Sequence, residues 1–109
     1  PSVRGQVNAL EDDQKRRATR SLRDGIDRVL TDLQSLFRDV VMIQYGRDGD
    51  LVNSERLDAL RALAGEWSPA RTLGVLDRIS VTRRNLEQNA APLLALESLM
   101  ITVANGSAP

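Results

Sequence analysis

The sequence contains no cysteine and no histidine, and its aromatic residues are limited to Phe37, Tyr45 and Trp67. Without cysteine there is no disulfide framework, and nothing points to an oxidising compartment. Without histidine or cysteine, a nucleophile–base pair or a transition-metal site has little to be built from. We therefore expect no catalytic residue, no metal and no cofactor, and we expect that the chain is not an enzyme.

Long hydrophobic runs and an excess of one charge are also missing. No apolar run approaches the roughly 18 residues of a membrane span, and no signal peptide is visible, so the default expectation is a soluble cytoplasmic protein. Fifteen basic residues balance fifteen acidic ones, which argues against a dedicated nucleic-acid binder. There is no G-x-x-x-x-G-K-[ST] phosphate loop. Asp48-Gly49-Asp50 lacks the further oxygen ligands of a calcium loop.

What the sequence does contain is aliphatic periodicity, strongest within residues 10–45, which we predict to be one long helix. Apolar residues there recur at alternating intervals of four and three, which predicts one buried face. These residues are Leu22, Ile26, Val29, Leu33, Leu36, Val40 and Ile43. Upstream of Leu22 the apolar pattern stops and charged residues follow one another. We therefore predict a helix that is half embedded in a bundle and half protruding as a charged arm.

Three further helices are predicted downstream. The first is capped by Asn53 or Ser54 and ends near Trp67, and the second begins at Ser68-Pro69, a strong start signal, and ends near residue 88. The last, capped by Asn89, is apolar over most of its circumference and is predicted to be the central helix. Leu76 and Leu96 complete the predicted core.

Together these patterns predict an all-α fold, an antiparallel bundle of four to five helices with one long N-terminal helix. Residues 1–9 are interpreted as a linker or tail, residues 10–104 as the helical domain and residues 105–109 as a disordered tail. A chain that begins within a linker suggests a piece of a larger protein.

Two polar features remain ambiguous in the sequence. Arg83 and Glu97 lie among apolar neighbours, and either their charged ends reach the surface or they form a partly buried ion pair. The basic residues between Lys15 and Arg23 belong either to a solvated or protein-binding helix face or to a nucleic-acid contact.

Several short motifs resemble the C-terminal region of bacterial DNA polymerase III delta-prime subunits, in particular those of the actinobacterial type. The first is the segment Glu11-Asp12-Asp13-Gln14-Lys15-Arg16-Arg17-Ala18-Thr19-Arg20, followed by Asp32-Leu33 and Phe37-Arg38-Asp39-Val40. Arg84-Asn85-Leu86-Glu87-Gln88-Asn89 and Ala91-Pro92-Leu93-Leu94-Ala95-Leu96-Glu97 continue the resemblance in the same order. It covers about Leu10 to Val103, and the order and spacing of the motifs make it more specific than any one motif alone.

The resemblance implies a part in DNA replication. Delta-prime is a subunit of the clamp loader, the AAA+ heteropentamer that opens the sliding clamp and places it on primed DNA. In that family the C-terminal helical domain joins its counterparts in a closed collar. The resemblance thus implies a non-catalytic oligomerisation domain whose partners are the gamma/tau and delta subunits, with DNA and the clamp reached only through the complete complex.

Charged residues are the predicted points of partner contact, because charges at interface rims govern specificity. The first candidates are the arm residues Arg16, Arg17 and Arg20, and the second are Arg38, Asp39, Arg83 and Arg84. Two rival interpretations remain open. One is a stand-alone helical protein-interaction module, and the other is a nucleic-acid-binding module that uses residues 15–23.

Overall fold

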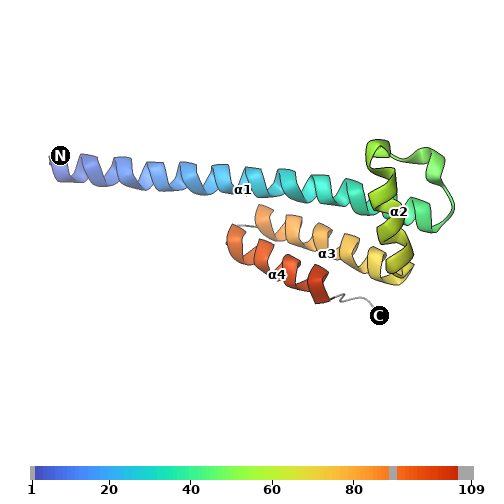
Figure 1. The fold of residues 1–109 in the computed structure, drawn as a ribbon. Coiled ribbons are helices and arrows are strands. Elements are labelled where there is room, and N and C mark those ends of the chain that lie inside the picture. The colour runs from blue at the N-terminus through green and yellow to red at the C-terminus, as the bar shows by residue number, and fades with distance from the viewer. Residues whose placement is uncertain (1, 89–90, 106–109) are drawn as a thin grey trace.

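The computed structural model describes residues 2–88 and 91–105, and all regular elements within these ranges are helices (Figure 1). They are α1 (Val3–Gln44), the short 3₁₀ turns η1 (Asp48–Asp50) and η2 (Ser54–Arg56), α2 (Leu57–Glu66), α3 (Pro69–Glu87) and α4 (Pro92–Asn105). Helix α3 runs antiparallel to α1, α4 runs antiparallel to α3, and α2 crosses the end of the bundle (Figure 1). The predicted all-α bundle with a long first helix is confirmed.

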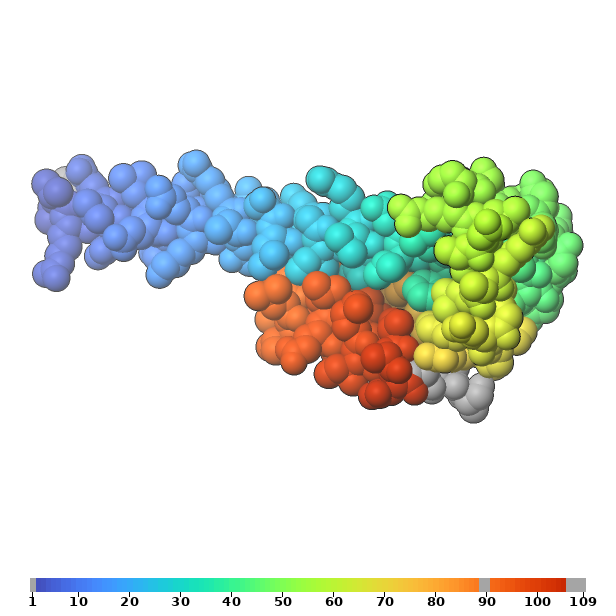
Figure 2. Space-filling view, viewed as in Figure 1, coloured from blue at the N-terminus to red at the C-terminus, as the bar shows by residue number. Residues whose placement is uncertain are grey.

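Helix α1 begins at Val3, earlier than the predicted start at about Leu10. The Ser2 hydroxyl accepts a hydrogen bond from the Gly5 N–H at 3.0 Å and so caps the first turn. Residues 3–9, interpreted from the sequence as a linker or tail, are therefore helical. At 42 residues the helix is about 63 Å long, and its N-terminal half extends beyond the bundle (Figure 2).

The other end of α1 follows the sequence prediction. Gly46 has a positive φ of 77°, a conformation that costs glycine little. This turn lets the Arg47 N–H donate to the Met42 carbonyl at 2.8 Å and the Gly46 N–H donate to the Ile43 carbonyl at 2.9 Å. The chain therefore leaves the helix where the Tyr45-Gly46 pair predicts.

The core lies among the embedded half of α1, α2, α3 and α4. Its buried apolar residues are Ile26, Leu30, Phe37, Val40, Leu60, Val75, Ile79, Leu86 and Leu99. Of the predicted core residues, Ile26 and Val40 are buried, and Leu33, Leu36, Leu76 and Leu96 are partly buried against this cluster.

Leu22 and Val29, also predicted as core, are instead 41% and 50% exposed. The prediction was wrong because two apolar registers overlap in this helix. Val29 and Leu30 are adjacent, about 100° apart around the axis, and the bundle buries Leu30. Leu22 lies one turn before Ile26, the first α1 residue buried in the bundle, and on the same flank as Val29.

Helix α4 is at the edge of the bundle, not at its centre as predicted (Figure 1). It packs on α3 and on one flank of α1, and Leu99 is its single buried residue among those described. The exposed apolar residues of α4 are Leu93, Leu94, Met100 and Ile101. Apolar residues all around a helix predict that every side of it is buried. The other helices described here cover only one side of α4.

The junction between α2 and α3 is as predicted. The Ser68 hydroxyl accepts a hydrogen bond from the Arg71 N–H at 3.1 Å, and Pro69 occupies the first turn of α3. The rings of Phe37 and Trp67 stack at 5.3 Å, and the Arg71 guanidinium lies 3.8 Å from the Trp67 ring centroid. These contacts fix the end of α2 against α1.

Two predictions concern the remaining ends. The predicted cap Asn89 and residues 106–109 of the predicted tail lie outside the described residues, while Asn105 is the last residue of α4.

None of the helices in the described ranges is both long enough and apolar enough to cross a membrane.

Candidate interaction surface

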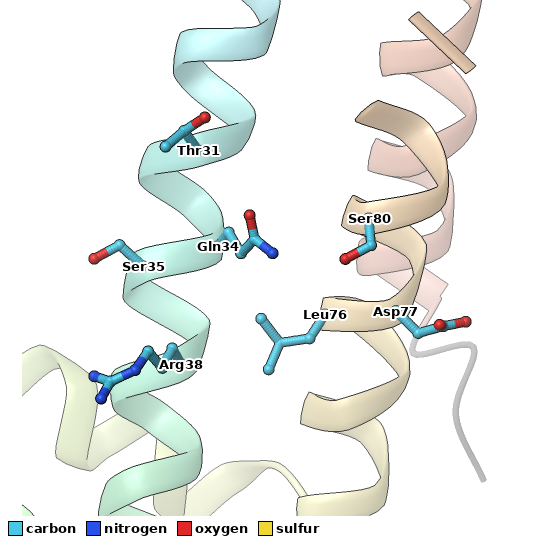
Figure 3. A pocket seen from close by; sticks show the side chains of 7 residues that line it. All are labelled: Thr31, Gln34, Ser35, Arg38, Leu76, Asp77 and Ser80. Atoms are coloured by element: carbon cyan, nitrogen blue, oxygen red, sulfur yellow. The ribbon is translucent and has the colours of Figure 1, made fainter. Parts of the chain in front are cut away.

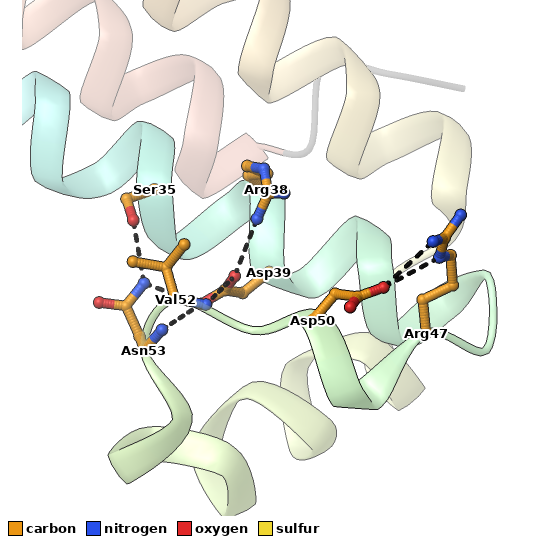
Figure 4. A network of polar contacts seen from close by, with 7 residues as sticks. All are labelled: Ser35, Arg38, Asp39, Arg47, Asp50, Val52 and Asn53. Atoms are coloured by element: carbon orange, nitrogen blue, oxygen red, sulfur yellow. Dashed lines mark hydrogen bonds and ion pairs between the residues drawn. The ribbon is translucent and has the colours of Figure 1, made fainter.

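Asp39, predicted as a partner contact, is fully buried and holds the loop after α1 (Figure 4). Its carboxylate accepts hydrogen bonds from the Val52 N–H at 3.0 Å, the Asn53 N–H at 2.7 Å and the Asn53 side-chain amide at 2.8 Å. The same amide donates to the Ser35 hydroxyl at 3.0 Å. Asp39 therefore stabilises the fold and is not available to a partner.

The electrostatics of Asp39 agree with this role. Burial by itself would raise the pKa of the carboxyl group, because it penalises the charged form. The hydrogen bonds from Val52 and Asn53, with the positive charge of Arg38 at 3.5 Å, outweigh burial and hold the pKa of Asp39 below its ordinary value. The carboxylate is thus ionised at neutral pH.

Arg83 forms the contact that the sequence left ambiguous, but with a different partner. Its guanidinium donates to the Asp27 carboxylate at 2.9 Å and to the Gln34 side-chain oxygen at 3.0 Å. Glu97, the alternative partner, is exposed on α4. The hydrogen bond to Asp27 raises the pKa of Arg83 further. Arg83 therefore ties α3 to α1, with about a third of its side chain exposed.

A shallow groove of about 510 Å³ runs between α1 and α3 next to this ion pair (Figure 3). Its lining residues are Thr31, Gln34, Ser35, Arg38, Leu76, Asp77 and Ser80. Although most of these side chains are polar, the larger part of the lining surface is apolar. Of these residues, the sequence analysis singled out Arg38 as a contact and Leu76 as core. The other five are polar side chains that come together because the two helices pack.

The arm of α1, defined here as the part from Val3 to Arg23, carries cations on more than one face. Lys15, Arg16, Thr19, Arg20 and Arg23 line one hollow of about 370 Å³. Arg17 lies on another side of the helix, where it pairs with Asp13. The three arm residues predicted as contacts are all exposed, and Arg20 borders both sides.

An apolar groove of about 500 Å³ lies between α1 and α4. Ala18, Ser21, Leu22, Gly25, Ile26, Val29 and Leu96 line it. Leu93 and Met100 are three and four residues from Leu96, so they neighbour it on the surface of α4. The sequence predicted Leu22, Val29 and Leu96 as core. Leu22 and Val29 instead border this groove on the surface, while Leu96 is partly buried and also lines it.

Within residues 2–88 and 91–105 no group of three histidine, cysteine, aspartate or glutamate side chains is placed to hold a metal ion. Arg84 is exposed on α3, and no ion pair or hydrogen bond of its side chain is seen within the same ranges. Two features of the described surface suit a partner protein: the apolar groove, with its exposed aliphatic side chains, and the exposed arginines of the arm.

The comparisons with known proteins point to one family. The family described as DNA polymerase III, delta subunit, C terminal, matches residues 18–104. No curated protein and no solved structure matches the chain significantly. The matched range begins in the arm and includes both sides of the apolar groove.

Proposed function

The chain belongs to the family described as DNA polymerase III, delta subunit, C terminal, and we propose from this that it is a clamp-loader collar domain. The sequence motifs, and not the family match, lead us to propose the delta-prime subunit. In this proposal it is of the actinobacterial type, as the sequence motifs suggest. Its task is to hold the clamp-loader pentamer together while the sliding clamp is loaded in DNA replication. The gamma/tau and delta subunits are its direct partners.

The observation that carries this proposal is the exposed apolar surface formed by α1 and α4. Leu93, Leu94, Met100 and Ile101 are each at least half exposed, and Leu22 and Val29 are close to half. Exposed aliphatic area is costly in water at about 25 cal/mol per Å², and a contiguous patch of it marks a protein contact. A partner subunit would bury this area.

A second feature supports a ring in particular. A closed ring of non-identical contacts needs two different faces on each subunit, one for each neighbour. The apolar groove and the groove between α1 and α3 lie on opposite flanks of α1, since Val29 and Thr31 are about 200° apart around the helix. The first flank offers mainly aliphatic side chains, and the second adds hydrogen-bonding side chains such as Gln34 and Arg38.

We further propose that the chain is non-catalytic and uses no cofactor, and that it meets DNA and the clamp only through the assembled complex. The absence of histidine and cysteine from the sequence supports this. A cytoplasmic location follows from the replication role.

The experiment that tests the function is reconstitution with the other clamp-loader subunits. The chain should co-purify with them and elute with the pentamer in size-exclusion chromatography. Charge reversal of Arg16, Arg17 and Arg20 should leave the circular dichroism spectrum unchanged, because these side chains are exposed on the arm and do not pack in the core. It should weaken co-elution with the other subunits. A chain that never elutes with the other subunits would refute the proposal.

A nucleic-acid-binding function is the second candidate, and one observation favours it. Lys15, Arg16, Arg20 and Arg23 converge on one hollow of the arm, which gives a local positive field despite zero net charge. Under this alternative the chain alone binds primed DNA, with an affinity that falls steeply as salt rises. Under the collar proposal it shows no such binding by fluorescence anisotropy.

A further inference from the structure

We infer that the face of α1 centred on Ser21 and Gly25 binds an amphipathic helix from another clamp-loader subunit. That helix carries apolar side chains along one side of its contact stripe and carboxylates along the other. The inference rests on the proposed function and adds the place of the contact and the chemistry of the partner.

Two hollows run along this face and share Ser21 and Gly25. The apolar groove of about 500 Å³ is bordered by Leu22, Val29 and Leu96. The second hollow, about 480 Å³, is lined by Arg17, Arg20, Asp24 and Arg28 in addition to the two shared residues. The middle of the face therefore has no bulky side chain, with aliphatic groups on one side and a net positive charge on the other.

No contact within the described part of the chain explains the glycine at position 25, in the middle of α1. A Cβ atom at Gly25 would meet nothing within 4 Å, so no internal contact requires glycine there. Glycine in the middle of a helix is destabilising relative to alanine. Close approach of another backbone is the usual use of a small residue on a helix face, and here the neighbour must come from outside the chain.

The geometry and charge of the face define what fits. Ser21, Gly25 and Val29 are spaced by four residues, the row that accepts the ridge of a second helix. The aliphatic side chains on one border would pack against the apolar side of that helix, and this apolar surface continues onto α4 at Leu96. The other border carries three arginines and Asp24, and one of the arginines, Arg17, is paired with Asp13. The positive charge that remains favours a partner with aspartate or glutamate there, as flanking charges do in coiled coils.

The experiment compares Gly25→Leu with Gly65→Leu in the full chain, using the reconstituted other clamp-loader subunits as the binding probe. Gly65 is the matched control, because it is an exposed helical glycine in α2 whose added Cβ also meets nothing within 4 Å. Both variants should raise the thermal midpoint, since leucine is the better helix former. Gly25→Leu should weaken binding at least tenfold, and Gly65→Leu should bind like the unaltered chain.

A charge variant tests the other border of the face. Arg17→Glu combined with Arg28→Glu should weaken binding and reverse the effect of salt at this border, because an acidic partner would then face like charge and salt would screen the repulsion.

The outcomes separate the two proposals. If the unaltered chain binds the other subunits and Gly25→Leu binds equally well, the inference falls and the proposed function stands. If the unaltered chain binds none of them, both fall. If the chain alone self-associates in analytical ultracentrifugation and Gly25→Leu abolishes this, the occupant is a second copy and the assignment to another subunit is overturned.

Discussion

Replacing Asp39 should be among the most destabilising single changes in the domain. Its side chain is fully buried, and Asp39→Ala leaves the N–H groups of Val52 and Asn53 and the Asn53 side-chain amide without their acceptor. A buried group that loses its partner costs about 1–3 kcal/mol. Val52 and Asn53 are not fully buried, so water replaces part of what is lost.

The expected loss from Asp39→Ala is therefore about 2–4 kcal/mol, below the sum of three such costs. In a domain of this size each kcal/mol shifts the melting temperature by roughly 4–8 °C, so the fall should be at least about 8 °C. Asp39→Asn should lose nearly as much, because its amide places a second donor against the N–H groups. Thermal unfolding followed by circular dichroism at 222 nm measures both.

Asp50→Ala is the control, since Asp50 lies in the same loop and pairs with Arg47 in an exposed contact. Exposed pairs contribute about 0–1 kcal/mol, so its melting temperature should barely change. Equal melting temperatures for Asp39→Ala and Asp50→Ala would refute the reasoning.

Acid provides an independent check on Asp39. Because the folded-state pKa lies below the unfolded value, the stabilisation is complete above the ordinary aspartate pKa of about 3.9 and is lost as the pH falls through the folded pKa. The stability difference between the unaltered chain and Asp39→Asn should therefore shrink as the pH falls below about 4. A stability difference that stays constant below about pH 4 would contradict the conclusion that the Asp39 carboxylate stabilises the fold in its ionised form.

Two further predictions concern the core register and the ion pair between α1 and α3. Leu30→Ala should cost about 2–5 kcal/mol through the cavity it leaves, whereas Val29→Ala, on the exposed flank, should cost roughly 0.5 kcal/mol or less; similar losses in urea unfolding would show that the register is wrong. A double-mutant cycle of Arg83→Ala with Asp27→Ala should give a coupling energy of about 0.5–1 kcal/mol. The same cycle with Glu97→Ala should give none.

Local signals in the sequence predicted the end of α1 and the junction between α2 and α3. The predicted cap of α2 by Asn53 or Ser54 was wrong, because the 3₁₀ turn Ser54–Arg56 comes before α2 and no side chain among the described residues caps the helix. Ser68-Pro69 and Gly46 determine how a helix starts or stops through their own backbone chemistry, without help from distant residues. Val3 was missed as the start of α1 because the residues after it show no apolar period. The cap supplied by the Ser2 hydroxyl forms without any apolar period in the residues that follow it.

Features that depend on distant partners could not be predicted in the same way. The hydrogen-bonding partners of Asp39 come from a loop 13 and 14 residues later in the chain, so an ionisable residue beside Arg38 was interpreted as surface. Adjacent apolar residues at 29–30 and 36–37 make the apolar pattern of α1 compatible with two different buried faces of the helix. Packing against α3 selects one of them. Helix α4 was placed at the centre because apolar composition predicts burial without saying whether the chain itself provides it.

The continuity of α1 has a mechanical consequence. The same helix that packs in the core at Val40 continues without interruption to Val3, so the arm behaves as a stiff lever about 29 Å long from Leu22 to Val3. If the helix tilted by about 10° at the bundle, a lever of this length would move its N-terminal tip by about 5 Å. Small changes in packing among α1, α3 and α4 would thus be amplified into displacements at the N-terminal end of the arm.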